Sequence, residues 1–507
     1  MKLALLFCIP AALAAASCES LAALPLLNTT LSAQSVAASG FKLPNGRAIP
    51  NLPAFCRVRG VIKPSSDSEI HFEVWLPSEN WSGRFEGIGN GGFAGSISMG
   101  GLAAAVLRGS AAAATDTGHT GAVNDATWAL GHAEKVIDFG YRAIHLTAQN
   151  ARAIIAAFYG NGARHSYFDS CSNGGRQAFM EAQRYPEDYD GIVAGAPAYY
   201  WTHLLTGGAW LAQSAETHPD EFIPPAKITV LQNAVLAACD LNDGVRDSVL
   251  ADPTKCKFDP GTLLCKSGDA PGCLTAPQVD LVRHIYAGTR DSAGHVIVPG
   301  FYPGGEAGPG GWSSWITGVQ PREAQGVIFG TQFYRNMVYE DATWSNGPGA
   351  TWTAEAGVKA ADSKLASTLN ATADDLGKFQ SRGGKLIVYH GWNDPAIPVQ
   401  GTIDYYNGLV SKMGAKKAAG FSRLYLVPGM QHCGGGPGAT SFDEMLPEIE
   451  KWVEENQAPG AVIAMRFKTD GNRSSGVLRT RPLCSYPQTA QWDGKGNPDD
   501  AASFACK

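Results

Sequence analysis

The sequence predicts an α/β fold with a mostly parallel sheet and a large inserted lid domain, and two observations indicate it. Short apolar segments typical of strands alternate with segments of helical periodicity in the first 198 residues and again after residue 370. Strands that alternate with helices favour a mostly parallel sheet covered on both faces. Residues 199–370 lose this alternation and are rich in Trp, Pro, Gly and Cys, which is typical of a domain inserted between two halves of a sheet.

The predicted elements follow from local patterns along the chain. Residues 69–76 alternate as a half-buried strand does, and residues 84–88 form a second short strand that runs into a glycine-rich turn. Residues 111–115 are typical of a buried strand. Ala, Ile and Leu recur at three- and four-residue spacing in residues 141–159, which predicts a helix. By the same criteria we expect strands at 166–170, 191–194, 385–389 and 423–427, and helices at 175–184 and 444–455.

The chain begins with the pattern of a secretory signal. Lys2 supplies a positive charge, Leu3 to Leu13 form an apolar run, and small residues at 14–17 offer a cleavage site. This run is too short to span a bilayer, and no later stretch is long and apolar enough to do so. We therefore expect a secreted, extracellular or periplasmic protein in four parts: a signal peptide at 1–17, a first core part at 18–198, a lid domain with a calcium site at 199–370, and a second core part at 371–507.

Composition narrows the class of partner. The net charge is −6 and no stretch is basic over several residues. Nucleic acid and anionic membranes are therefore not expected partners. The abundance of Gly and Pro with sparse charge suits a loop-rich extracellular enzyme.

The cysteine count agrees with export. The sequence has 11 cysteines, and removal of Cys8 with the signal leaves an even number, which favours five disulfides in an exported protein. Cys18 directly follows the small residues and offers an alternative, a lipid-modified N-terminus, although Ala15 stands where a lipoprotein signal usually has Leu. The sequence alone does not fix the pairs among Cys18, Cys56, Cys171, Cys239, Cys256, Cys265, Cys273, Cys433, Cys484 and Cys506.

Ser172 is the candidate nucleophile. It lies between a predicted strand and a predicted helix, in the sequence DSCSNGG. A nucleophile elbow needs small residues two places before and two places after the serine, because the turn is tight and the serine backbone is strained. Ser170 and Gly174 occupy those places. The alternative is that Ser172 merely caps the helix.

Two further residues complete a catalytic pattern. Asp394 follows the strand predicted at 385–389, and His432 lies in a glycine-rich loop after the strand predicted at 423–427. The order Ser, Asp, His is that of α/β-hydrolases, in which the His acts as base and the Asp orients it. Taken singly, an Asp before Pro is commonly a turn residue and a lone His is more often structural. The correctly ordered trio favours an α/β-hydrolase with a catalytic triad.

Cysteines flank two members of this trio. Cys171 directly precedes Ser172, and Cys433 directly follows His432. If these cysteines are bonded, the disulfide limits the separation of Ser172 Oγ and His432, which must meet at hydrogen-bond distance. The alternative, two unrelated cysteines, makes both adjacencies a coincidence.

The Cys-Ser pair, the Asp and the His-Cys pair together resemble the tannase and feruloyl esterase family, which also includes the hydrolase of mono(2-hydroxyethyl) terephthalate. The resemblance covers nearly the whole mature chain, and Ser170 departs from it where the family often has glycine. It implies an α/β-hydrolase core, a large lid, a disulfide beside the triad and hydrolysis of aromatic carboxylic esters. The implied disulfides are Cys171–Cys433, Cys18–Cys56, Cys239–Cys256, Cys265–Cys273 and Cys484–Cys506.

The glycine-rich segment at residues 87–92 is the candidate oxyanion loop. Its spacing also fits a dinucleotide fingerprint, but no helix and acidic residue complete such a unit. Glycines let a backbone amide approach a substrate carbonyl closely, and the family resemblance favours the amide of Gly92 or Gly91, with Gly92 preferred. The second donor is the amide of Asn173, at the start of the helix after the nucleophile. A purely structural turn is the alternative.

The segment CDLNDGVRDSV, residues 239–249, is a candidate calcium site. Its clustered carboxylates repel one another unless they are solvated or bind a cation, and oxygen ligands around a glycine turn suit Ca²⁺. The spacing is not that of an EF-hand, and a solvated acidic turn is the alternative. We expect a structural ion in a loop away from the chemistry. The resemblance implies the carboxylates of Asp240, Asp243 and Asp247 and the carbonyls of Val245 and Val249 as ligands.

The predicted lid is rich in aromatic residues that could stack on an aromatic acyl group, although such residues more often form a core. They are Trp201, Trp210, Trp312, Trp315, Phe329, Phe333 and Tyr334. We expect one or two of them to contact the substrate. Ile397, just after Asp394, is a candidate pocket wall, and Arg335 is a candidate partner for a polar ring substituent.

The function that these residues predict is hydrolysis of aromatic, feruloyl-type esters by a serine esterase, without an organic cofactor. The substrate is a small aromatic ester, free or attached to plant polysaccharide or polyphenol. A tannase or another aromatic monoester hydrolase is the alternative within the class. A secreted calcium- or glycan-binding protein on an inactive hydrolase scaffold is the alternative of another class.

Overall fold

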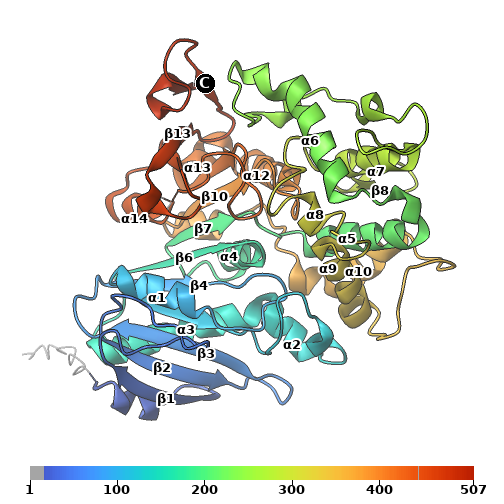
Figure 1. Cartoon of the computed structure of the whole chain (residues 1–507). Coiled ribbons are helices and arrows are strands. Elements are labelled where there is room, and N and C mark those ends of the chain that lie inside the picture. Colours follow the sequence, from blue (N-terminus) through green and yellow to red (C-terminus); the bar gives the residue numbers. More distant parts are fainter. Residues whose placement is uncertain (1–15, 443–444) are drawn as a thin grey trace, which may run out of the picture.

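A nine-stranded sheet runs through the centre of the molecule (Figure 1). A computed structural model describes residues 16–442 and 445–507, so the predicted signal peptide lies almost entirely outside the described residues. The strand order is β1-β2-β3-β5-β4-β6-β7-β10-β11. The strands are β1 (Thr29–Val36), β2 (Phe55–Ile62), β3 (Ile70–Pro77), β4 (Arg84–Ile88), β5 (Ala111–Thr115), β6 (His165–Cys171), β7 (Gly191–Gly195), β10 (Lys385–Gly391) and β11 (Ser422–Val427).

The sheet is antiparallel at one edge and parallel elsewhere. Strands β1, β2, β3 and β5 pair antiparallel, and all pairs from β5 through β4, β6, β7 and β10 to β11 are parallel. Because the carboxyl ends of parallel strands meet at one edge, the loops after β6, β10 and β11 lie together. The predicted α/β fold with a mostly parallel sheet is confirmed.

Helices cover both faces of this sheet. Successive strand residues point to opposite faces, so Phe168 packs with one layer of helices and Tyr167 with the other. The first face is covered by α3 (Ala143–Tyr159), α4 (Asn173–Arg184), α11 (Gly377–Ser381), α12 (Val399–Met413) and α13 (Ala415–Phe421). The second face is covered by α1 (Met99–Leu107) and α14 (Met445–Glu455).

A mostly helical segment is inserted between β7 and β10, and it forms the green to yellow half of Figure 1. Its helices α5 (Trp201–Thr217) and α9 (Gln325–Phe333) lie against each other closely enough that a Cβ on Gly208 would come within 2.4 Å of the Gly326 carbonyl oxygen. The other elements are α6 (Pro225–Cys239), α7 (Ala276–Ala287), β8 (Thr289–Arg290), β9 (Val296–Val298), α8 (Trp312–Trp315) and α10 (Ala354–Leu369).

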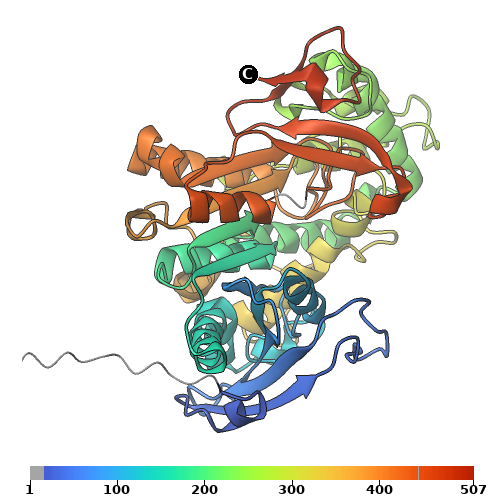
Figure 2. The same ribbon diagram turned by 90° about the vertical axis from the view of Figure 1, so that its left-hand side faces the viewer.

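The C-terminal segment forms two small hairpins at the end of the molecule opposite β1 (Figure 2). Strand β12 (Val462–Phe467) pairs with β13 (Val477–Leu483), and β14 (Ala490–Trp492) pairs with β15 (Phe504–Cys506). Arg479 and Arg481 of β13 reach across to the carboxylate of Asp247 in the inserted segment.

Five disulfides join the pairs that the family resemblance implied: Cys18–Cys56, Cys171–Cys433, Cys239–Cys256, Cys265–Cys273 and Cys484–Cys506. Because Cys18 Sγ is bonded to Cys56, this thiol is not free to carry a lipid, which argues against the lipoprotein alternative. Over residues 16–442 and 445–507, the helices are all too short or too polar to traverse a bilayer.

Candidate active site

Ser172 occupies a sharp turn between β6 and α4. Its φ of +68° is a conformation that L-residues rarely adopt, which is the strain a nucleophile elbow imposes. The turn is held because Ser172 N–H donates to the Gly195 carbonyl at 2.9 Å. The serine at position 170 fits because its neighbours are glycines: a Cβ on Gly174 would lie 1.9 Å from Ser170 Oγ, and one on Gly89 would lie 2.5 Å from it.

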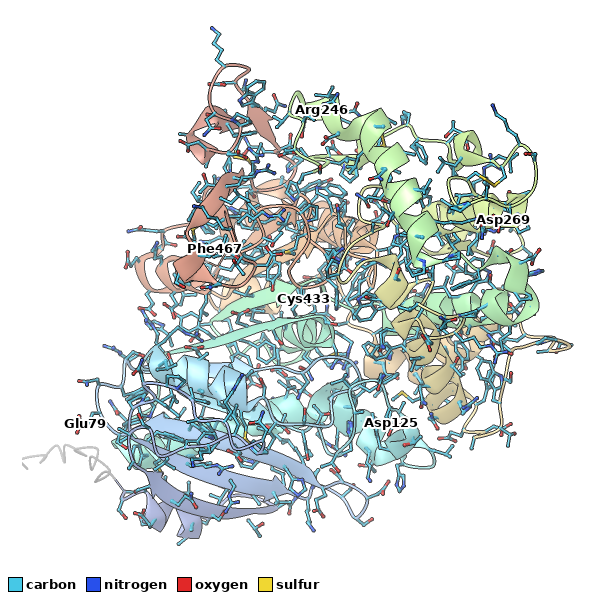
Figure 3. The ribbon with its side chains drawn as sticks, in the orientation of Figure 1. Glu79, Asp125, Arg246, Asp269, Cys433 and Phe467 are labelled. Atoms are coloured by element: carbon cyan, nitrogen blue, oxygen red, sulfur yellow. A yellow bond between two sulfur atoms is a disulfide. The ribbon has the colours of Figure 1, made fainter. Side chains whose placement is uncertain are left out.

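The structure brings Ser172, His432 and Asp394 together from the loops after β6, β11 and β10. His432 Nε2 lies 2.9 Å from Ser172 Oγ, and His432 Nδ1 lies 2.8 Å from Asp394 Oδ2. The Cys171–Cys433 disulfide lies directly beside them, and Figure 3 shows Cys433 near the middle of the molecule. With Nδ1–H donating to the carboxylate, His432 Nε2 is free to accept the proton of the Ser172 hydroxyl.

Asp394 is buried, but its charge is well supported. Burial alone raises the pKa of this carboxyl, yet the charge of His432 and hydrogen bonds from His390 and His432 hold it well below its ordinary value. Its Oδ1 also accepts from the backbone N–H groups of Ala396 and Ile397, at 2.8 and 3.0 Å. Asp394 is therefore an anion in contact with His432 Nδ1.

His390 is a residue of this site that the sequence analysis missed. It lies near the end of β10, is fully buried, and places Nε2 at 3.1 Å from Asp394 Oδ2. The available signal was a histidine at the carboxyl end of a predicted parallel strand, four residues before the candidate acid.

The glycine loop after β4 is fastened to the helix that follows Ser172. Asn90 N–H donates to Gln177 Oε1 at 2.9 Å, and Gln177 Nε2 donates back to Asn90 Oδ1 at 3.2 Å. Gly92 has φ of +54° and lines the same cavity as Ser172. Asn173 is the first residue of α4, so its backbone N–H has no partner within the helix. Gly92 and Asn173, the two predicted oxyanion donors, thus lie at the same site as Ser172.

A buried histidine, His119, stabilises the glycine loop through the residue that follows it. His119 Nε2 lies 2.8 Å from the Phe93 carbonyl oxygen, and its ring stacks on Trp128 with 3.7 Å between centroids. Burial lowers the pKa of His119 to about 4, so the ring is neutral at pH 7 and Nε2 donates to the carbonyl.

An apolar cavity of about 110 Å³ leads to Ser172, His432 and Gly92. None of the described residues that line it is Lys, Arg, Asp or Glu, and His284 and His432 are its only titratable side chains. Ile397 lines it, as does part of the predicted aromatic set, namely Trp201, Trp210, Trp315 and Phe329. Trp312, Phe333 and Tyr334 are buried core residues instead.

The prediction for Arg335 needs correction. Arg335 does not line the cavity, because its guanidinium donates to the Trp344 carbonyl oxygen at 3.0 and 3.2 Å. It therefore stabilises a turn of the inserted segment and does not form part of the cavity wall.

The predicted calcium loop is rich in oxygen atoms. Asp240 Oδ1 is buried without a hydrogen-bond partner, which suits a ligand of a cation. Asp243 and Asp247 each use Oδ1 to accept a backbone N–H, and burial raises the pKa of both carboxyls. The residues fit Ca²⁺, although in the described part of the chain only His145, Glu181 and Asp188 bring three side-chain ligand atoms of His, Cys, Asp or Glu within 4.8 Å of one another.

This loop is closer to the candidate site than we expected. A Cβ on Gly429 would lie 3.1 Å from the Val249 side chain, and Gly429 is three residues before His432. The loop therefore packs against the segment that carries the candidate base.

Comparisons with known proteins define the class. An uncharacterized esterase of Xanthomonas campestris is 39% identical over 97% of this chain and 91% of its own length, and the mono(2-hydroxyethyl) terephthalate hydrolase of Piscinibacter sakaiensis is 34% identical over 90% and 85%. The crystal structure of feruloyl esterase B from Aspergillus oryzae covers 97% of this chain and 100% of that chain, with a TM-score of 0.86 and 29% identity. The chain is a carboxylesterase with an α/β-hydrolase fold.

The family of the chain is identified by a match to a family model. The model described as "Tannase and feruloyl esterase" matches residues 56–507. The chain belongs to the tannase and feruloyl esterase family.

Proposed function

We propose that this carboxylesterase is a secreted serine esterase that cleaves aromatic esters of the feruloyl type, with Ser172 as nucleophile, His432 as base and Asp394 as the residue that orients the base. One observation carries the proposal: His432 lies within hydrogen-bond distance of both Ser172 Oγ, at 2.9 Å, and Asp394 Oδ2, at 2.8 Å, beside an apolar cavity. A nucleophile bonded to a base that a third group orients is the arrangement that acyl transfer requires.

The reaction has two acyl-transfer steps. His432 Nε2 takes the hydroxyl proton as Ser172 Oγ attacks the ester carbonyl, and the amides of Gly92 and Asn173 stabilise the oxyanion. The protonated His432 then gives its proton to the leaving alkoxide, which departs as the alcohol. Water, deprotonated by His432, attacks the acyl-enzyme, and collapse of the second intermediate releases the acid and restores Ser172.

The cavity suits uncharged aromatic acyl groups. Its lining by Trp201, Trp210, Trp315 and Phe329 suits stacking on a ring, and it offers few polar partners. A galloyl group carries three hydroxyls that need hydrogen bonds, whereas a feruloyl group carries one hydroxyl and one methoxy group. Galloyl esters are therefore the second choice of substrate.

Calcium and export complete the proposal. Asp240, Asp243 and Asp247 with the carbonyls of Val245 and Val249 would hold a structural Ca²⁺ that neutralises their charge. The five disulfides and the apolar N-terminal run support an extracellular or periplasmic location.

The test compares initial rates on methyl ferulate and methyl gallate, with Ser172→Ala beside an exposed control, Ser292→Ala. We expect faster ferulate cleavage, loss of both activities in Ser172→Ala, and labelling of the wild type but not of Ser172→Ala by a fluorophosphonate. Faster gallate cleavage would make the enzyme a tannase. If a well-folded wild type is not labelled by the fluorophosphonate and cleaves neither ester, the result would favour the non-catalytic alternative.

A further inference from the structure

A second histidine contacts the carboxylate that orients His432. His390 Nε2 lies 3.1 Å from Asp394 Oδ2 and also 3.1 Å from the Ile397 carbonyl oxygen. On the other side of the ring, Nδ1 lies 2.8 Å from the hydroxyl of Thr402, a buried residue of α12. The proposed reaction gives no role to this histidine.

The partners of His390 define which ring nitrogen carries the hydrogen. Both atoms that face Nε2 are acceptors only, a carboxylate and a carbonyl oxygen, so Nε2 must carry the hydrogen. The Thr402 hydroxyl can donate to Nδ1, which satisfies both nitrogens in the Nε2–H tautomer.

Asp394 Oδ2 is consequently shared between two histidines. It accepts from His432 Nδ1 at 2.8 Å and from His390 Nε2 at 3.1 Å, while Oδ1 accepts two backbone N–H groups. These four donors fix the plane of the carboxylate. Among the described residues, the titratable groups that contact Asp394 are His390 and His432. Because both donate to Oδ2, the hydrogen bond from His390 reduces the negative charge available to His432.

We propose that His390 is a positioning residue of the esterase: its Nε2–H holds Asp394 Oδ2 against His432 Nδ1 and ties the Asp394–Ile397 turn, which forms part of the cavity wall, to strand β10. Thr402 selects the tautomer that makes this possible. The inference rests on the proposed function, in which Asp394 orients His432. In this role, His390 influences both the orientation and the basicity of His432 through Asp394.

Two pairs of matched variants test this role. His390→Phe keeps a ring and removes the donor, whereas His390→Gln keeps an N–H near the position of Nε2. Thr402→Val removes the hydroxyl, and Thr402→Ser retains it. We expect His390→Phe to lower kcat by about 10- to 100-fold, as loss of one hydrogen bond to a charged group implies. His390→Gln and Thr402→Ser should recover most of this loss, and Thr402→Val should lie in between.

The pH profile separates positioning from packing. The acid limb of kcat/KM reports the base of the free enzyme, and without the donor from His390 the carboxylate binds protonated His432 more strongly. The limb should therefore move to higher pH in His390→Phe and stay in place in His390→Gln. A packing role would lower the thermal midpoint without moving the limb. An unmoved limb in His390→Phe, or equal kcat values for the Phe and Gln variants, would overturn the inference.

Two controls keep the result interpretable. If His390→Phe does not fold, Thr402→Val against Thr402→Ser decides, because equal kcat and equal acid limbs in these two would exclude a selected tautomer. If Ser172→Ala retains activity, the proposed triad fails. If Ser172→Ala is inactive and the His390 variants behave as wild type, only the present inference fails.

Discussion

A disulfide between Cys171 and Cys433 joins the immediate neighbours of Ser172 and His432, which are far apart in the sequence, since the two cysteines are separated by 262 residues. The two loops therefore cannot move apart without distorting a covalent link. This link constrains the same distance, Ser172 Oγ to His432 Nε2, on which proton transfer depends in the proposed reaction.

Removal of this disulfide should reduce activity more than a comparable loss of stability explains. We expect Cys171→Ala with Cys433→Ala to lose about 2–5 kcal/mol of unfolding free energy and to show a lower kcat at temperatures where it stays folded. The matched control is Cys265→Ala with Cys273→Ala, which opens a loop of separation 8 in the lid. Equal kcat values for both double variants would show that the link does not position the site.

The calcium loop predicts a response to chelation. EGTA should lower the thermal midpoint, and excess Ca²⁺ should restore it, because a ligand at 100 times its Kd stabilises the native state by about 2.7 kcal/mol. Asp240→Asn should weaken the response, and Asp259→Asn, an exposed aspartate of the same segment, should not. A thermal midpoint indifferent to chelator and to added Ca²⁺ would refute the site.

His119 predicts a pH-dependent stability. Its pKa of about 4 lies below the ordinary value near 6.5, so between these values the unfolded chain binds more protons than the folded chain. Stability contributed by neutral His119 is therefore present above about pH 6.5 and is lost as the pH falls toward 4, by roughly 3 kcal/mol in total. His119→Gln, which retains a donor for the Phe93 carbonyl, should flatten unfolding free energy against pH in this range, whereas exposed His295→Gln should not.

Arg176 predicts a large loss of stability on truncation. This guanidinium is fully buried in α4, where it donates to the carbonyl oxygens of Phe139, Gly140 and Leu369 and to Asn173 Oδ1. Arg176→Met would leave these acceptors unsatisfied, so we expect a loss of about 3 kcal/mol or more in urea unfolding. Arg283→Met, at an exposed arginine, should change the unfolding free energy by less than about 0.5 kcal/mol.

The uncharged cavity predicts discrimination by substrate charge. Monomethyl terephthalate carries a free carboxylate, and dimethyl terephthalate does not. Because none of the described residues lining the cavity is Lys or Arg, the carboxylate would be desolvated without a partner. We expect kcat/KM to be at least about tenfold higher for the diester, which corresponds to about 1.4 kcal/mol. Equal values would mean that the acid group lies outside the cavity.

The parallel part of the sheet and strand β3 could be predicted from the sequence, but the two outer antiparallel strands β1 and β2 could not. Strand β1 buries only its last residue, so it lacks the apolar alternation of a core strand. Strand β2 contains Arg57, and a charged residue argues against a buried strand when the sequence is read alone. In the structure, Glu73 on the neighbouring strand neutralises this arginine at hydrogen-bond distance. Cross-strand partners of this kind are not visible in a single segment.

The candidate triad could be predicted because each member follows an apolar strand in a fixed order. The role of His390 behind Asp394 could not be predicted in this way. It depends on a contact with Thr402 on α12, and the sequence does not reveal which face of that helix packs against the strand. The same reasoning explains Arg335, since nothing local indicates that the Trp344 carbonyl engages its guanidinium.

The contact of Arg479 and Arg481 with Asp247 has a consequence for how substrate reaches Ser172. The inserted segment is attached to the sheet where its chain enters after β7 and leaves before β10, and the C-terminal hairpin holds it at a further place. We therefore expect no swinging of the whole segment between open and closed forms. Under the proposed function, esters on an insoluble polymer would then have to project from its surface to enter an opening of fixed shape, so the enzyme would release side groups and leave the polymer backbone intact.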